Sequence, residues 1–427
     1  MQILYLLILL FLITSFEIGS FNVFFGSDIH NAAVVVCFLS VLIYFLFRAS
    51  KYRKIINSGY LSPSEFKYFF LIILVSGVYF IFHSLIVGPL GSAKYSAYVL
   101  ILFILITQFQ KIFFDKFCKI FFIFMAIVSA AAVFQILLVA ISGSSIYDFE
   151  PLKKNGDLWF RPVDYAMPYF LTYSSMEESV TFGPLTFVRA IGFSAEPKFF
   201  SILLWAAYGI CLSWTSLKSR APLFLIRASL LLGLFFAHAY SSLFVFVMAA
   251  LFYFILKKGT ISDKFKVFLI LGVPIFVSIA VTFAGAIILE IMPAGSYQAS
   301  RMESFIYTSG GFYLFEIPNF GMIGSSLVSE ENELVSGVTM LLHWARLGHL
   351  GFLLYLMPIA FIIYKSIVNF RYLEKHQMYS QAILLSVFIT YYQIFISQPY
   401  TLFSIFILAS LYIRSRSFIR RGLDDAC

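Results

Sequence analysis

The feature of this sequence that most limits its fold is a series of twelve apolar stretches. A helix needs about 20 mostly apolar residues to cross a bilayer, and 61% of the 427 residues are hydrophobic while 12% are charged. This composition excludes a soluble globular domain. We predict an all-α polytopic membrane protein in which residues 1–427 form one membrane domain of about twelve transmembrane helices. The stretches lie near residues 2–16, 31–47, 68–88, 95–109, 119–142, 198–214, 222–237, 240–256, 267–290, 347–364, 378–397 and 400–413.

The basic residues fall mainly in alternate loops, and this bias predicts the orientation of the helices. With the N-terminus in the cytoplasm, the cytoplasmic loops contain 21 of the 30 Lys and Arg residues, against eight in the outside loops. Both termini are therefore predicted to be cytoplasmic. Because orientation accounts for the net charge of +9, that charge does not indicate a nucleic-acid partner.

Two of the predicted outside loops, 143–196 and 291–346, are much longer than ordinary connections between helices. Both are rich in aromatic residues, which argues against disorder. We predict that they fold over the outer mouth of the helix bundle and carry the function.

The first candidate motif is RAIGFSAEPKFFSILL, residues 189–204, where the first long loop enters a span. Pro197 fits the first position of a helix, so Glu196 lies at or beside the N-cap, where the helix dipole favours a charged carboxylate. A plain N-cap with Arg189 and Lys198 as interfacial anchors is the alternative interpretation.

The second candidate motif is LLHWARLGHLGFLLYL, residues 341–356. In a helix His343 and Arg346 share a face, which suits proton transfer and anion binding. Interfacial anchoring, helped by Trp344, is the alternative, and His349 is expected to be a packed or capping residue.

Further polar residues lie in or near the outside loops. Arg301 and Glu303 belong to the second long loop and precede a glycine-rich stretch in which Gly321 suits a tight turn. His83 lies near the outer end of its span, where a polar side chain is expected to face the protein interior.

Several common chemistries have no counterpart in the sequence. It contains no Walker loop, dinucleotide fingerprint, HExxH motif or G-x-S-x-G elbow. The outside loops contain no DxD pair of carboxylates. We therefore expect no cofactor and no metal.

The ordered set of motifs resembles the Wzy-type polymerase and O-antigen ligase superfamily. The set comprises RAIGFSAEP before a span, the short outer turn Tyr240-Ser241-Ser242, an Arg-containing second loop, and His343 followed by Gly348 and Gly351. The resemblance implies a GT-C-like bundle in the bacterial inner membrane with a periplasmic active site. Its substrates would be glycans on undecaprenyl diphosphate, with a chain-length regulator and a flippase as partners.

The resemblance and the chemistry together suggest roles for five residues. Positive charge is needed where a diphosphate leaves, and arginine supplies it without a metal; Arg189, Arg301 and Arg346 are the candidates. A base must accept the proton of the acceptor hydroxyl. His343, expected to be neutral beside Arg346, and Glu196 both remain open for that role.

Two other functions remain as alternatives. The first is an O-antigen ligase, but two features depart from the pattern of the ligases and favour a polymerase. They are Trp344 directly after His343, and Tyr240-Ser241-Ser242 in the short turn. A flippase or transporter would more often have compact loops and paired broken helices.

We predict that reporter fusions at Lys258 and at the C-terminus will both report the cytoplasm, because both positions lie in segments rich in basic residues. A matched fusion within residues 143–196 should report the outside. A periplasmic signal at Lys258 would contradict the topology.

Overall fold

The structure is a computed structural model of the full chain. It describes residues 61–87, 93–109, 111–142, 149–151, 153–154, 157–158, 164–166, 173–182, 185–192, 197–212, 214, 220–237, 240–257, 260–293, 299, 321–323, 340–373, 406–414 and 416, with isolated positions 39 and 43.

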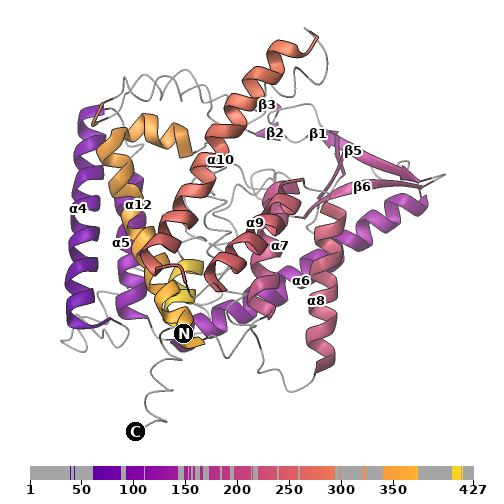
Figure 1. The fold of residues 1–427 in the computed structure, drawn as a ribbon. Helices are drawn as coiled ribbons and strands as arrows, with labels where there is room; N and C mark the ends of the chain where they lie inside the picture. The colour runs from indigo at the N-terminus through magenta and orange to yellow at the C-terminus, as the bar shows by residue number, and fades with distance from the viewer. Residues whose placement is uncertain are drawn as a thin grey trace. The chain divides into compact units, whose positions relative to one another are not determined.

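Helices occupy nearly all the described residues of the predicted apolar stretches (Figure 1). They are α4 (Pro63–Val87), α5 (Ala93–Gln108), α6 (Lys111–Ser142), α7 (Pro197–Leu212), α8 (Arg220–Ala237), α9 (Tyr240–Lys257), α10 (Asp263–Ile291) and α12 (Met340–Leu373), and residues 406–414 are also helical. The predicted stretch 2–16 lies outside the described residues, as do 378–397 and almost all of 31–47.

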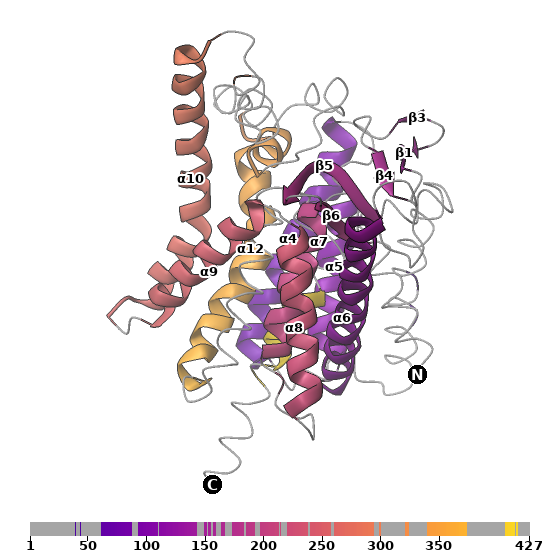
Figure 2. The same cartoon turned by 90° about the vertical axis from the view of Figure 1, so that its right-hand side faces the viewer.

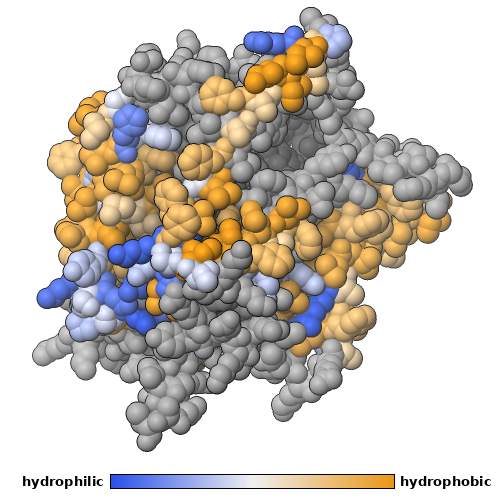
Figure 3. Space-filling model, in the orientation of Figure 1, coloured by the Kyte–Doolittle hydropathy of each residue, from blue (hydrophilic) through white to orange (hydrophobic). Residues whose placement is uncertain are grey.

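Three of the described helices are long and apolar enough to cross a bilayer, namely Pro63–Ile86, Ile112–Ile141 and Leu347–Asn369. Exposed apolar side chains cover one side of α4, including Leu71, Val78 and Phe82, and Figure 3 shows an apolar surface over that helix. Such a surface is unfavourable in water and suits a helix that faces lipid. The chain is thus largely helical, with the apolar helices of a membrane protein.

The chain divides into two compact units. The first unit comprises residues 1–48, 110–253 and 373–389, and the second comprises residues 49–109, 254–372 and 390–427.

In the first unit, α6, α7 and α8 pack against one another (Figure 2). Ser129 of α6 donates to the Ser229 carbonyl at 2.6 Å, and Ser229 of α8 donates to the Ala126 carbonyl at 2.7 Å. A Cβ at Gly233 would overlap the Ser129 hydroxyl. Small residues thus let α6 and α8 approach closely, as is common between helices in membranes.

A β-sheet lies across one end of α6, α7 and α8 (Figure 2). Its strand order is β1 (Phe149–Pro151), β4 (Asp164–Ala166), β5 (Tyr173–Phe182) and β6 (Leu185–Gly192), all antiparallel, and β2 (Lys153–Lys154) pairs with β3 (Asp157–Leu158). The first long loop therefore contains strands that were not predicted, and its position over the outer mouth of the bundle stays a prediction. Gly183-Pro184 between β5 and β6 was the signal for a hairpin.

In the second unit, α4, α5 and α12 pack through aromatic residues. The rings of Phe69 and Phe361 stack with their centroids 4.9 Å apart, and the Tyr95 and Tyr355 rings meet edge to face at 5.3 Å. Such pairs stabilise packing beyond the apolar area that they bury.

Basic side chains donate hydrogen bonds to carbonyls at the ends of two helices. Arg227 donates through Nη2 to the Cys211 carbonyl at 3.3 Å, at the end of α7. Lys266 is 2% exposed and donates through Nζ to the Leu256 carbonyl at 2.9 Å, at the end of α9. A cation is favoured there because the last turn of a helix carries partial negative charge.

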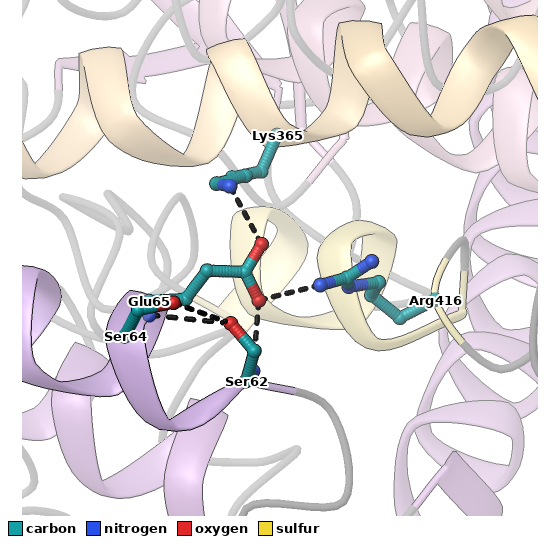
Figure 4. Close-up of polar contacts among 5 residues, drawn as sticks. All are labelled: Ser62, Ser64, Glu65, Lys365 and Arg416. Atoms are coloured by element: carbon teal, nitrogen blue, oxygen red, sulfur yellow. Dashed lines mark hydrogen bonds and ion pairs between the residues drawn. The ribbon is translucent and has the colours of Figure 1, made fainter.

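An ion cluster in the second unit joins three helical segments (Figure 4). Glu65 accepts from Lys365 of α12 at 2.6 Å and from Arg416 at 2.5 Å. Glu65 also accepts from the Ser62 amide at 2.8 Å, while the Ser62 hydroxyl accepts from the Glu65 amide at 3.3 Å. The latter pair is a capping box with Pro63 at the first helical position.

We predict that Glu65→Ala lowers the free energy of unfolding by about 2–3 kcal/mol, because Lys365 and Arg416 lose a charged acceptor. Glu65→Gln should cost less, since its amide oxygen can still accept from Ser62. Unfolding of the purified protein by a denaturing detergent would measure both changes.

Ser64→Ala is the matched control, because the Ser64 hydroxyl contacts the Ser62 hydroxyl at the exposed start of the same helix. Its effect should stay within about 0.5 kcal/mol. Equal stability of Glu65→Ala and Ser64→Ala would contradict a stabilising role for the cluster.

Candidate functional site

The first candidate motif begins in β6, the second strand of the β5–β6 hairpin, and continues into α7. Within β6, Val188, Ala190 and Ile191 are fully buried, and the strand contacts α6, α7 and α8. A well-packed strand therefore fixes the backbone of the motif against the helix ends.

Arg189 lies in β6 opposite Ser175 of β5. Its side chain is half-buried, and Nε donates to the carbonyl of Ala237, the last residue of α8, over a long 3.4 Å. A guanidinium at a helix C-terminus is electrostatically favourable. The contact gives Arg189 an anchoring role that sequence reasoning missed, because nothing in the sequence relates residue 189 to residue 237.

Gly192 ends β6 in a conformation that favours glycine. Its φ is 64°, and a Cβ there would overlap the ring of Phe200 in the first turn of α7. Phe200 is fully buried and has little room to move. Glycine is therefore required where the motif turns from the strand toward the helix.

α7 begins at Pro197, as the sequence predicted. Glu196 directly precedes it in the sequence but lies outside the described residues. The predicted N-cap role of Glu196 is therefore still a prediction.

The second candidate motif lies in α12, where Gly348 has φ 69° and interrupts the helical backbone. Met340–Leu347 therefore forms a short helical segment that precedes the break. His343 and Arg346 stand three residues apart in this segment, so the predicted helix is confirmed; their side chains are outside the described part of the structure.

Trp344 and His349 contact each other across the break. Trp344 donates through Nε1 to Nδ1 of His349 at 2.9 Å, and the Trp344 ring stacks on Phe352 at a centroid distance of 5.0 Å. His349 is thus a packed residue, as expected from the sequence. Its Nδ1 must be unprotonated, because it accepts this hydrogen bond.

The second long loop contributes a tight turn at residues 321–323. Gly321 has φ 60°, which agrees with the predicted turn. The carbonyls of Gly321 and Met322 accept from the amides of His349 and Leu350 at 3.1 and 3.3 Å. The turn therefore caps the helical segment that follows the break. Arg301 of the same loop lies outside the described residues.

His83 of α4 contacts this turn and is buried, as expected for a polar residue in a span. Its Nε2 lies 2.8 Å from the Ile323 carbonyl, and the side chain is 6% exposed. Glu290, which also lies near the predicted outer end of its span, is exposed.

The described candidate residues are divided between the two compact units. Arg189 belongs to the first unit, and His343 and Arg346 belong to the second. Among the described residues, no group of three or more His, Cys, Asp or Glu side chains is placed to hold a metal ion.

No protein-family model, no curated protein and no solved structure matches this chain.

We predict that Gly192→Ala destabilises the protein by about 2–4 kcal/mol, because it combines a left-handed backbone with an overlap against a buried ring. Gly77→Ala is the matched control, since a Cβ there meets nothing within 4 Å in the middle of α4. The control should be neutral or stabilising by about 0.5–1 kcal/mol. Thermal unfolding in detergent would compare the two, and equal midpoints would refute the steric requirement at Gly192.

Proposed function

We propose that this chain is a membrane glycosyltransferase that polymerises oligosaccharide repeats carried on undecaprenyl diphosphate. In this proposal it has a GT-C-like fold of about twelve spans, both termini are cytoplasmic, and the reaction occurs at the periplasmic face of the bacterial inner membrane. The products would be O-antigen or capsular polysaccharide.

The observation that carries the proposal is that glycines of the sequence motifs lie at positions where the backbone requires glycine. Three glycines in the motifs that carry the resemblance lie in described segments, namely Gly192, Gly348 and Gly351. Two have positive φ, and a Cβ on Gly351 would lie 2.7 Å from the Tyr79 hydroxyl oxygen. The motif glycines therefore stand where this chain has a structural need for glycine, which supports a role for these motifs in shaping the backbone.

The contacts within each unit agree with the proposed orientation. Glu65, Lys365 and Arg416, which meet in the ion cluster, all lie at positions predicted to be cytoplasmic. Around the break in α12, Ile323 lies in a loop predicted to be outside, while His83 and Gly348 lie near the predicted outer ends of their spans. Arg189, also predicted outside, meets the predicted outer end of α8.

The proposed reaction needs three contributions from the protein. The acceptor hydroxyl attacks the anomeric carbon of the donor sugar, the bond from that carbon to the diphosphate oxygen breaks, and the diphosphate leaves with the electron pair. Arginine side chains stabilise the developing negative charge, and we assign this role to Arg189, Arg301 and Arg346. A base removes the hydroxyl proton, and His343 and Glu196 are its two candidates.

The anchoring of Arg189 suits this assignment. A guanidinium presents several N–H donors in one plane, and Nε of Arg189 is directed at the end of α8. A side chain fixed at one nitrogen loses less conformational freedom when it binds a phosphate. Arg189 thereby acquires a preorganised position at the edge of the folded loop.

We predict that Arg189→Ala reduces polymerisation by about 100- to 1,000-fold, the usual cost of losing a preorganised donor to a developing anion. Arg189→Lys should recover little, because an ammonium group cannot reproduce the planar fork of arginine. The measurement is the polysaccharide ladder on a gel, in cells with matched amounts of the protein in the membrane.

Arg227→Ala is the matched control, because Arg227 also donates to a carbonyl at the end of a helix, α7. If Arg189 acted only as a helix cap, both variants would lose about 1 kcal/mol of stability and have similar ladders. The proposal requires a normal ladder for Arg227→Ala and a lost ladder for Arg189→Ala. A normal ladder for Arg189→Ala would remove this residue from the site.

A further inference from the structure

The break in α12 at Gly348 exposes backbone groups that a continuous helix would have paired. At this position φ is 69° and ψ is −178°, so the helix must end and begin again. Carbonyls before such a break and amides after it lose their partners within the helix. In an apolar environment each unsatisfied group costs several kcal/mol, so other parts of the protein must supply partners.

Tyr79 of α4 supplies one partner on the near side of the break. Its hydroxyl donates to the Leu347 carbonyl at 2.9 Å. The Tyr79 ring also lies where a side chain at residue 351 would otherwise project, because a Cβ on Gly351 would be 2.7 Å from it. Tyr79 therefore holds the last residue of the segment Met340–Leu347.

The turn at residues 321–323 supplies partners on the far side, and His83 holds that turn. The Gly321 and Met322 carbonyls accept from the amides of His349 and Leu350. The carbonyl of the next residue, Ile323, lies 2.8 Å from Nε2 of His83. Because a carbonyl oxygen only accepts, Nε2 must carry the proton of this hydrogen bond.

Tyr79 and His83 form one structural pair on α4. They lie four residues apart, which places them on one face of the helix, and their rings are 5.7 Å apart between centroids. One residue holds the segment before the break, and the other holds the turn that caps the segment after it. Together they determine the angle at which Met340–Leu347 leaves the rest of α12.

That segment contains His343 and Arg346. Arg346 directly precedes Leu347, the residue held by Tyr79, and His343 directly precedes Trp344, which donates to His349 across the break. We propose that Tyr79 and His83 are positioning residues of the polymerase reaction, which hold the helical segment bearing His343 and Arg346 at the angle that the reaction requires. This inference rests on the proposed function.

The test uses the full-length protein in lipid nanodiscs, with a lipid-linked repeat unit as donor and acceptor. Tyr79→Phe removes the hydroxyl and keeps the ring, while His83→Ala removes the contact with Ile323. Each should lower kcat by about 10- to 100-fold, the cost of a small misplacement of reacting groups, and leave KM within about twofold. His83→Gln should recover most of kcat, because its amide N–H can still donate to the Ile323 carbonyl.

Ser76→Ala is the matched control. Ser76 is a buried residue of α4 that donates to the Leu354 carbonyl at 2.9 Å, in the segment after the break. This variant removes one hydrogen bond between the same two helices without touching the break. Its kcat should remain that of the wild type.

Hydrogen exchange at the amides of His349 and Leu350 gives a readout that is independent of activity. These amides should exchange faster in His83→Ala, because the turn that accepts from them is released, and should be unchanged in Ser76→Ala. Agreement between faster exchange and lower kcat would support the positioning role. A structural role alone predicts faster exchange with full kcat, or an equal loss of kcat in Tyr79→Phe and Ser76→Ala.

Failure of the inference and failure of the proposed function have different signatures. A wild-type protein that does not extend the lipid-linked repeats would refute the proposed function, and the positioning role with it, before any variant is compared. An active wild type whose Tyr79→Phe and His83→Ala variants retain full kcat would refute the positioning role alone.

Discussion

The rest of this structure depends on one constraint, which is that backbone groups at helix ends need partners from within the protein. In an apolar surrounding, water does not compensate a carbonyl or an amide that a helix leaves unpaired. The described segments show the consequence repeatedly. Arg227 donates to a carbonyl at the end of α7, and Arg189 donates to one at the end of α8. Lys266 donates to a carbonyl at the end of α9. Each is a cation at the negative end of a helix dipole, where its charge is favourable.

The same constraint places the candidate functional residues beside helix ends. Arg189 contacts the end of α8 and is also part of the proposed diphosphate site, so in the proposal one side chain would have both a structural and a chemical role. The break at Gly348 creates further unpaired groups, and Tyr79 and the turn at 321–323 satisfy three of them. A helix broken in this way can direct its short first segment separately from the rest, and that segment contains His343 and Arg346.

Within the described residues, the sequence predicted the positions of the helices well, because a helix that crosses a bilayer needs a long apolar stretch and Pro, Gly and charged residues mark its ends. The start of α7 at Pro197 is one example. The sheet of the first long loop was missed, because β1 and β4 have only 3 residues each and the pairing of the longer β5 and β6 depends on tertiary contacts. The break at Gly348 was missed for a similar reason: its partners, Tyr79 and Gly321, lie far from it along the chain. Tyrosine and histidine at positions 79 and 83 of one helix face were the available signal.

The central claim is that this chain links lipid-borne sugar repeats outside the inner membrane. Deleting its gene and separating the cell-surface polysaccharide on a gel tests that claim most directly. The account predicts that the ladder disappears and a band with a single repeat unit remains, with restoration by the wild-type gene. Loss of every capped species with lipid-linked polymer retained would indicate a ligase, and repeat units trapped on the cytoplasmic face would indicate a flippase. Either result, or an unchanged ladder, would contradict the account.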